Sequence, residues 1–222
     1  MHKGGFTLAK GNVSLSVVRR LPRYHRFLKD LLNAGTVRIS SGDLSAKMGL
    51  TASQIRQDLN CFGGFGQQGY GYNVKDLYEE ISKILGLGKH RKAILLGAGN
   101  LGRAIVLHMD FSSRGFELAG IFDSNPELVG LKVGSLAVQD SAGLEDFCRQ
   151  HHPDVAILCI PKEAAKSTAA VLVRYGIRGF WNFSHYDLAL DYDGVAVENV
   201  HLGDSLSTLC FRINELEKAE KE

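Results

Sequence analysis

The chain has 222 residues, of which 45% are hydrophobic and 23% charged, and its formal net charge is +2. This composition suits one or two packed domains and excludes a disordered chain, a collagen-like chain and a coiled-coil rod. No apolar run approaches the ~18–20 residues of a bilayer-spanning helix, and the N-terminus lacks the apolar core of a signal peptide. We therefore expect a cytoplasmic protein without a membrane partner.

Positive charge gathers in the first part of the chain. Residues 1–89 contain 13 Lys or Arg and 6 Asp or Glu, whereas residues 90–222 contain 13 and 18. A basic part joined to an acidic part indicates a polyanion partner for the basic part. A basic face that meets only solvent is the alternative.

The cysteines form no motif. They are scattered and include no Cys-x-x-Cys pair: Cys61, Cys148, Cys159 and Cys210. This usage favours a reducing compartment and predicts neither a disulfide framework nor a metal site. A redox-active thiol remains an alternative to ordinary apolar cysteines.

The first helix is expected to open at residues 20–22, because proline is tolerated in a first turn, and to end at Gly35. Its inward side is marked by apolar residues at helical spacing: Leu21, Tyr24, Leu28 and Leu31. A short strand follows at residues 37–39. Ser40 and Ser41 then cap a second helix that Gly49 stops.

A third helix is predicted at residues 51–60, where Thr51 and Gln54 fit a capping box. Ile55 and Leu59 lie four residues apart and face inward. The residues left to project outward are polar: Ser53, Arg56, Gln57 and Asn60. Two short helices joined by a glycine turn predict a helix-turn-helix whose second helix reads the major groove of double-stranded DNA, where Arg pairs with guanine and Gln or Asn with adenine.

Residues 62–72 alternate glycines with aromatic residues, which predicts a tight β-hairpin, or wing, that runs close to a phosphate backbone or minor groove. A flexible low-complexity segment is the alternative. The residues expected to contact DNA are Phe65, Gly66, Gln67, Gln68, Gly69 and Tyr70. Asn73 then caps a helix that runs to residue 85. We assign residues 1–85 to a winged-helix domain, with residues 1–16 as a flexible arm, and residues 86–91 to a linker.

A glycine fingerprint follows the apolar run at residues 93–96 and precedes a helix-like segment. In a dinucleotide-binding turn the first glycine permits the turn, the second lets the backbone approach a pyrophosphate, and the third lets helix and strand pack. The residues expected at the cofactor are Gly97, Ala98, Gly99, Asn100, Leu101 and Gly102. A glycine turn in an α/β domain without a ligand is the alternative.

The next predicted strand, at residues 117–123, ends in Asp123, which lies 26 positions after Gly97, somewhat beyond the usual spacing. Its carboxylate is placed to bind a ribose diol and would repel a 2′-phosphate. The sequence therefore favours NADH and NAD+ over their phosphorylated counterparts.

The remaining pattern predicts a doubly wound parallel sheet of six or seven strands, a Rossmann domain at residues 92–202. It includes an edge strand at Val133, a helix at residues 140–152 and a strand buried on both faces at residues 155–160. Ile160 and Pro161 lie at the carboxyl end of that strand, where ligands of such sheets bind. Further elements are expected at residues 164–175, 179–183 and 195–197. The amphipathic tail, residues 203–222, can pack on its own domain.

Five stretches, specific when taken together, carry a resemblance to a known family: Arg20-Leu21-Pro22-x-Tyr24, Ile39-Ser40-Ser41, Gln54-Ile55-Arg56-x-Asp58-Leu59, Phe62-Gly63-x-Phe65-Gly66 and Gly69-x-Gly71-Tyr72. Through them, residues 17–85 resemble the winged-helix domain of the Rex redox-sensing transcriptional repressors. The resemblance continues through the dinucleotide domain to about residue 215.

This resemblance implies a homodimer that binds a pseudo-palindromic operator, releases it when NADH binds, and exchanges its C-terminal helix between subunits. It also implies that Arg56 reads a base and that the wing enters the minor groove. Family members usually carry basic residues on the wing and at position 57, whereas this chain has Gln57, Gln67 and Gln68. The departure predicts a weaker salt dependence of DNA binding and an altered operator preference.

The resemblance also implies three polar positions that couple cofactor to DNA. Arg26 matches the expected arginine of the first helix. His108 replaces the tyrosine expected on the first Rossmann helix, and His201 replaces the acid expected before the C-terminal helix. Two histidines can form a pH-dependent contact instead of the usual hydrogen bond. Ordinary surface or core histidines are the alternative.

An enzyme is the main competing hypothesis. No substrate domain follows the Rossmann domain. The available histidines show no catalytic spacing with an acid: His108, His151, His152, His185 and His201. The CoA-binding half of an acyl-CoA ligase is also possible but leaves the helix-turn-helix unexplained. We therefore expect a DNA-binding regulator and not an enzyme.

Overall fold

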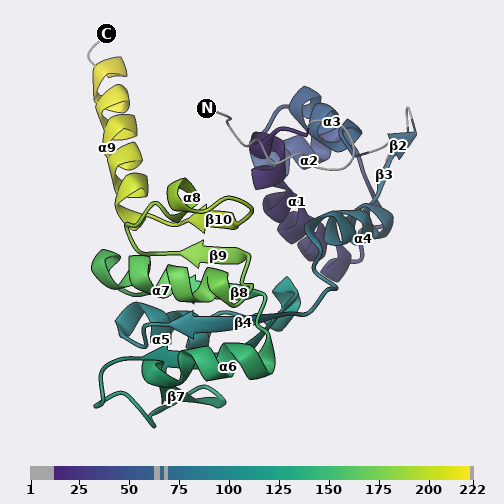
Figure 1. Cartoon of the computed structure of the whole chain (residues 1–222). Coiled ribbons are helices and arrows are strands. Elements are labelled where there is room, and N and C mark those ends of the chain that lie inside the picture. Colours follow the sequence, from purple (N-terminus) through teal and green to yellow (C-terminus); the bar gives the residue numbers. More distant parts are fainter. Residues whose placement is uncertain (1–12, 63–65, 68–69, 221–222) are drawn as a thin grey trace. The chain divides into compact units, whose positions relative to one another are not determined.

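The computed structural model describes residues 13–62, 66–67 and 70–220. The chain forms two compact units, Met1–Lys89 and His90–Glu222, whose boundary falls inside the expected linker (Figure 1). Most of the arm proposed for residues 1–16 lies outside the described residues.

The first unit combines four helices with a small antiparallel sheet among its described residues. Strand β3 is central, pairs with β1 and β2, and so forms the expected hairpin with β2. The elements are α1 (Leu15–Asn33), β1 (Arg38–Ile39), α2 (Ser41–Met48), α3 (Ala52–Asn60), β2 (Gly66–Gln67), β3 (Gly71–Asn73) and α4 (Val74–Leu85).

Helix α1 begins earlier than the sequence analysis predicts. Its N-cap is Ser14, whose side chain accepts a hydrogen bond from the Val17 amide, and Pro22 lies inside the helix. Proline removes one intrahelical hydrogen bond, but apolar burial on both sides of Pro22 holds the helix together. The expected start at residues 20–22 is therefore wrong, and Leu15, assigned to the arm, belongs to α1.

The core of the first unit explains why these short elements fold. The inward residues of all four helices meet in one cluster, which includes Leu21, Tyr24, Leu28, Leu44, Met48, Ile55, Leu59, Leu77 and Ile81. Polar N-caps begin the helices where the sequence predicts them: Ser40 caps α2, Thr51 caps α3 and Asn73 caps α4. Helices too short to be stable alone are thereby fixed by a common apolar core.

The second unit is built on a seven-stranded sheet with the order β10-β9-β8-β4-β5-β7-β6. Neighbouring strands are parallel except β6 and β7. The strands are β4 (Arg91–Leu96), β5 (Phe116–Asp123), β6 (Lys132–Val133), β7 (Leu136–Asp140), β8 (Val155–Leu158), β9 (Gly179–Asn182) and β10 (Ala196–Asn199). The doubly wound sheet predicted from the sequence is confirmed.

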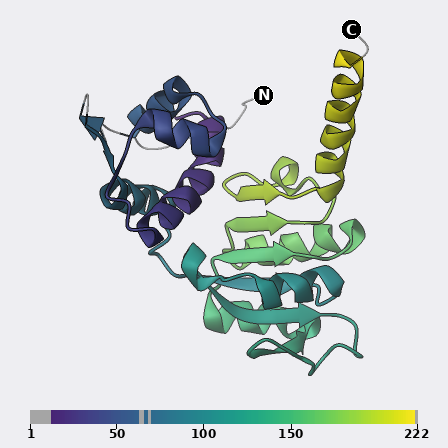
Figure 2. The same ribbon diagram turned by 180° about the vertical axis from the view of Figure 1, so that it is seen from behind.

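Helices cover both faces of this sheet (Figures 1 and 2). Alternate residues of β4 point to opposite faces of the sheet. Ile94 belongs to the apolar cluster formed with α6 and α7, whereas Leu95 belongs to the apolar cluster formed with α5. The helices are α5 (Asn100–His108), α6 (Leu144–His151), α7 (Lys162–Arg174) and α8 (Leu188–Asp191). A parallel sheet buried on both faces explains the continuous apolar runs in its sequence.

The predicted helix at residues 140–152 is too long. Asp140 ends β7, a strand that the sequence analysis did not predict, and its side chain accepts a hydrogen bond from the Ala142 amide. A single 3-10 turn separates this residue from the start of α6 at Leu144. The aspartate therefore caps the turn between strand and helix.

The C-terminal helix α9 (Leu202–Ala219) extends from the end of the sheet that carries β10 (Figure 1). None of its residues is buried. Its exposed apolar side chains are Leu202, Leu206, Leu209, Phe211, Ile213 and Leu216. The alternative in which this helix packs on its own domain is therefore wrong, because none of the residues that the structure describes covers its apolar face.

Candidate cofactor and DNA-binding sites

The glycine turn joins β4 to α5 at the carboxyl edge of the sheet. Gly97 has a φ of +97°, and a Cβ there would overlap the backbone carbonyl of Cys159. A Cβ at Gly102 would overlap the carbonyl oxygen of Gly97, so α5 is packed directly against the turn. Open space surrounds the Cβ position of Gly99, as a phosphate that approaches the backbone requires.

Asp123 lies beside this turn despite its distance in sequence. One carboxylate oxygen, Oδ2, accepts a hydrogen bond of 2.6 Å from the Ala98 amide, and Oδ1 accepts one of 2.8 Å from the Asn125 amide. The side chain is half-buried. Each oxygen keeps a second lone pair with which to accept a ligand hydroxyl.

Strand β8 brings two more predicted residues to the same edge. It pairs with β4, and the residues after it include Ile160, whose side chain borders the Gly97 position, and Pro161, which precedes α7. The glycine turn, Asp123 and the segment after β8 therefore lie around one candidate cofactor site at the carboxyl edge of the sheet. His108 is not brought there: it is exposed at the opposite end of α5, about 12 Å along the helix from Asn100.

The thiols in this unit are poor candidates for redox chemistry. Burial raises the pKa of Cys159 to about 12, and burial followed by the nearby Glu145 carboxylate raises that of Cys148 to about 11. Both groups stay protonated at neutral pH, and a thiol is far less nucleophilic than a thiolate. The redox-thiol alternative is unsupported at these two positions.

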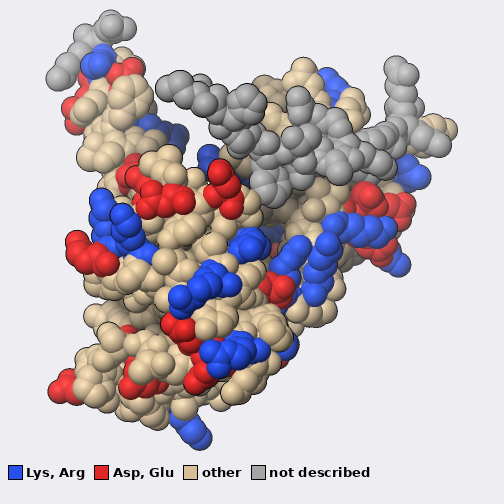
Figure 3. Space-filling view, viewed as in Figure 1, with Lys and Arg blue, Asp and Glu red and all other residues tan. Residues whose placement is uncertain are grey.

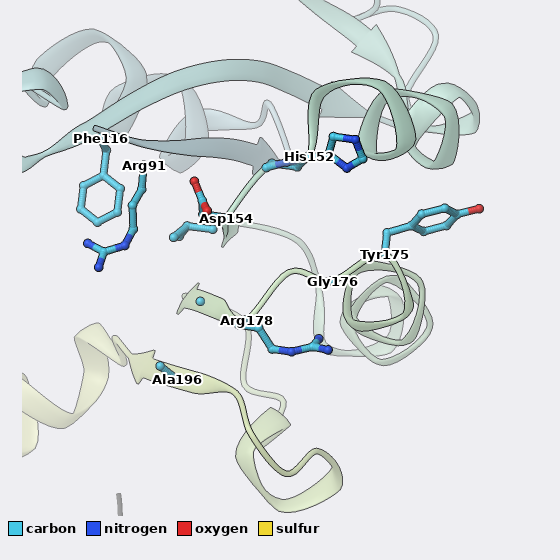
Figure 4. Close-up of a pocket in the computed structure, with 11 residues that line it drawn as sticks. Arg91, Phe116, His152, Asp154, Tyr175, Gly176, Arg178 and Ala196 are labelled. Atoms are coloured by element: carbon cyan, nitrogen blue, oxygen red, sulfur yellow. The ribbon is translucent and has the colours of Figure 1, made fainter. Parts of the chain in front are cut away.

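A separate pocket of about 650 Å³ opens at the opposite edge of the sheet, where the strands begin (Figure 4). Two of its charged side chains, Arg178 and Asp154, already have partners within the protein. Arg178 donates to the carbonyls of Val173 and Ile177, and Asp154 accepts from the Lys92 amide. Ligands of parallel α/β sheets bind at the carboxyl edge, so the glycine turn is the better cofactor site.

In the first unit, α2 and α3 form the predicted helix-turn-helix. Ile55 and Leu59 are buried, whereas the four residues predicted to face outward are exposed: Ser53, Arg56, Gln57 and Asn60. Arg56 is already oriented, because its Nη1 donates a 3.0 Å hydrogen bond to the Ser41 hydroxyl of α2. The outward face of α3 thus combines a held guanidinium with amides that can pair with base edges.

The capping box predicted at the start of α3 is only half formed. The Thr51 hydroxyl accepts from the Gln54 amide at 3.1 Å, as expected. The Gln54 side chain, however, donates to the Asp58 carboxylate at 2.8 Å instead of reaching back to Thr51. A buried acid one turn further along the helix competes successfully for the amide group.

Asp58 was missed as a key residue by the sequence analysis. It is completely buried, and besides Gln54 it accepts hydrogen bonds from Arg20 Nε at 2.6 Å, Arg20 Nη2 at 2.7 Å and the Tyr24 hydroxyl at 2.9 Å. Burial alone would raise the pKa of the carboxyl, but these hydrogen bonds hold it below its usual value. Its burial could have been predicted from its position, because a residue three positions after the inward Ile55 lies on the same side of a helix.

The wing is described in part. Gly66 pairs with Tyr72 and Gln67 with Gly71, which forms the hairpin. Tyr70 at its tip is 70% exposed, and its carbonyl accepts a hydrogen bond from Arg38. Phe65, Gln68 and Gly69 lie outside the described residues.

Two of the positions predicted to couple cofactor to DNA lie in separate units. Arg26 is exposed on α1. His201 precedes α9, stacks on His185 with ring centroids 4.8 Å apart, and has its Nδ1 3.4 Å from an Asp204 oxygen. Its Nε2 is buried and has no hydrogen-bond partner among the described residues.

On the face of the second unit seen in Figure 3, positive and negative side chains are mixed. Among the described residues, no three or more His, Cys, Asp or Glu side chains gather as a metal site would require. None of the helices in the described ranges combines the length and apolarity of a bilayer crossing.

Comparison with known proteins decides the family. A family model described as "Putative DNA-binding protein N-terminus" matches residues 12–60, and one described as "CoA binding domain" matches residues 88–186. The redox-sensing transcriptional repressor Rex of Thermoanaerobacter pseudethanolicus is 57% identical over 96% of this chain and 94% of its own length. This chain belongs to the Rex family. The Rex protein of Clostridioides difficile is 53% identical over 94% of this chain and 99% of its own.

Solved Rex structures have the same fold. The Rex-family repressor RSP in complex with NAD+ and operator DNA has a TM-score of 0.86 and 56% identity, and covers 96% of this chain and 97% of its own. RSP in complex with NADH has a TM-score of 0.85 and 53% identity, over 96% and 99%. The winged-helix and Rossmann architecture is confirmed. Rex proteins are transcriptional repressors, so the enzyme hypothesis is wrong.

Proposed function

We propose that this Rex protein represses transcription as a homodimer on a pseudo-palindromic operator and leaves it when NADH binds. Support comes from two features of one chain: an outward helix face suited to base recognition and a glycine turn open to a dinucleotide. The RSP complexes with NAD+ and operator DNA and with NADH are those of a close relative. We place this activity in the cytoplasm.

The cofactor site is proposed at the glycine turn. The free amides at the start of α5 face the pyrophosphate, and the helix dipole favours its negative charge. Asp123 accepts from the ribose hydroxyls, and Ile160 and Pro161 line the approach from β8. His108, at the far end of α5, is proposed on the nicotinamide side of the cofactor.

The operator site is proposed on α3 and the wing. Arg56 donates to a base edge, and its neighbours Ser53, Gln57 and Asn60 contact bases or phosphates. Wing residues 65–70 approach the minor groove. Because glutamines stand at positions 57, 67 and 68, fewer counterions are released on binding than with lysine or arginine there, so the salt dependence is shallow.

The dimer is proposed to form through α9. An 18-residue helix with six exposed large apolar side chains needs a partner surface, and a second copy of the chain supplies one. Two winged helices in such a dimer can meet half-sites about one helical turn of DNA apart. Arg26 and His201 are proposed to carry the coupling between cofactor and DNA.

The redox response is a coupling free energy between the two sites. A coupling of ~3 kcal/mol changes operator affinity by about 150-fold, and reciprocity requires that DNA weaken NADH binding by the same factor.

Fluorescence anisotropy of a labelled pseudo-palindromic duplex tests the proposal. NADH is expected to release the duplex, while NAD+ at the same concentration leaves it bound. Equal operator affinity with and without saturating NADH would refute redox sensing. Failure to bind any such duplex would refute the repressor function as a whole.

A further inference from the structure

The buried acid of the recognition helix has no role in the proposed contacts with DNA or cofactor. Asp58 lies on the inward side of α3, and its side chain is fully buried. Its two oxygens receive four hydrogen bonds, two each, from Arg20, Tyr24 and Gln54. A carboxylate has about four acceptor positions, so none is left for another partner.

This arrangement fixes α3 relative to α1. Arg20 and Tyr24 lie one turn apart on α1. They therefore donate hydrogen bonds to the same carboxylate from two positions about 6 Å apart along that helix. The Arg20 guanidinium binds in the two-pronged geometry that restricts rotation as well as distance. A slide or a roll of α3 against α1 would break at least one of these bonds.

The opposite side of α3 carries the predicted base contacts. Arg56 precedes Asp58 by two residues, so the two side chains leave the helix in nearly opposite directions. Arg56 has its own support, because Ser41 of α2 accepts a hydrogen bond from its Nη1. The hydrogen bonds of Asp58 and the guanidinium of Arg56 therefore lie on opposite sides of one short helix.

We propose that Asp58 is a positioning residue for operator recognition: by holding α3 on Arg20 and Tyr24, it sets the orientation in which Arg56 meets a base edge. This inference rests on the proposed DNA-binding function. It makes discrimination between DNA sequences, and not affinity for DNA in general, the property that depends on Asp58.

Electrostatics separates this role from a general effect on DNA binding. Removing an acid raises the positive charge of a DNA-binding unit and strengthens attraction to phosphates on any sequence. A lost positioning residue instead weakens binding to the operator alone, because base contacts are sensitive to orientation. The two effects have opposite signs on the operator.

The test compares the Asp58→Asn variant with the Asp30→Asn variant, a matched control that removes an exposed acid of α1. The probes are the duplex that the unmodified chain selects from a randomised pool and a scrambled duplex of the same composition. We expect Asp58→Asn to lower the ratio of the two affinities by about tenfold or more, as losing a base contact does, while Asp30→Asn leaves the ratio unchanged. NADH binding, followed by its fluorescence, should be the same in both.

Further variants keep every outcome informative. Tyr24→Phe removes one donor and keeps the ring, and we expect a loss of discrimination of about threefold in the same direction. If Asp58→Asn fails to fold, the Tyr24→Phe variant tests the positioning role in its place. Folded variants of Asp58 and Tyr24 with unchanged discrimination would overturn the positioning role. Unchanged discrimination in Arg56→Ala would instead overturn the proposed use of α3, which separates the two failures.

Discussion

Two aspartates serve the two sites in different ways. Asp58 receives four side-chain hydrogen bonds and is closed to solvent, whereas Asp123 receives two from backbone amides and remains half-exposed. The number of free lone pairs follows from this difference. Asp58 can only hold protein groups in place, but Asp123 can also accept hydroxyls from a ligand.

Asp123→Ala is expected to weaken NADH binding by about tenfold to a hundredfold, because two charge-assisted hydrogen bonds to the ribose would be lost. NADH fluorescence titration measures the change. Asp154→Ala is the matched control, since Asp154 also accepts from a backbone amide but lies at the opposite edge of the sheet. Equal losses in both variants would remove the ribose role from Asp123.

The hydrogen bonds to Asp58 also predict an acid-sensitive first unit. Its carboxyl has a pKa below the unfolded value of about 3.9, so the stabilisation is present above that value and is lost as the pH falls through the folded-state pKa. Asp58→Asn should cost about 3 kcal/mol of unfolding free energy at pH 7, the low end for a buried pair because Arg20 is partly exposed, and much less once the pH has fallen below the folded-state pKa of Asp58. Urea unfolding followed by circular dichroism measures both; the same loss at both pH values would contradict the ion-pair explanation.

At the scale of elements, the β4–turn–α5 segment is built by close approach. Gly102 has no room for a side chain because α5 sits against the Gly97 carbonyl, but Gly99 is surrounded by open space and has ordinary backbone angles. The two glycines therefore have different roles: Gly102 lets the helix pack against the turn, and Gly99 leaves space for a phosphate.

This difference predicts opposite outcomes for two identical substitutions. Gly102→Ala should lower the unfolding free energy of the second unit by about 2 kcal/mol or more through overpacking. Gly99→Ala should leave stability nearly unchanged but weaken NADH binding about tenfold or more. Gly143→Ala, which also meets open space, controls for the effect of an added methyl. Thermal unfolding measures the stability of each variant, and NADH titration measures its affinity for the cofactor. A Gly102→Ala variant with unchanged stability and unchanged NADH affinity would contradict the prediction.

Helix α1 is the other element with a wider role. It supplies Arg20 and Tyr24 to the recognition helix and also carries Arg26, the proposed coupling residue, less than two turns further on. A displacement of α1 would therefore move α3 with it. The first unit is expected to respond to the cofactor as a rigid body.

At the scale of the whole molecule, the exposed apolar face of α9 predicts assembly. On a helix, Leu206 and Leu209 lie on the same side, and Asn214 lies about 140° from Leu209. Leu209→Asp should therefore shift the dimer towards monomer and reduce operator affinity by about tenfold or more, since one half-site is lost. Asn214→Asp adds the same charge elsewhere on α9. Sedimentation measures the mass, and an unchanged dimer in Leu209→Asp would place the interface elsewhere.

The sequence alone determined the features that depend on near neighbours. Side-chain caps, the 3.6-residue apolar period and the glycine spacing act over a few residues, so they predicted α2, α3, α4 and the β4–turn–α5 segment correctly. The start of α1 was misplaced because the preference of proline for a first turn outweighed the less conspicuous cap at Ser14.

Tertiary structure decided which distant groups meet. Asp58 reads as one more polar residue of α3, and only packing against α1 brings Arg20 to it across 38 positions. The same holds for Asp123, which reaches the Ala98 amide because β4 and β5 pair in parallel and their carboxyl ends coincide. The exposure of α9 was equally undecided, because an amphipathic period shows that a face is to be buried but not which surface covers it. Short-range rules give the elements, and only the packed chain gives their partners.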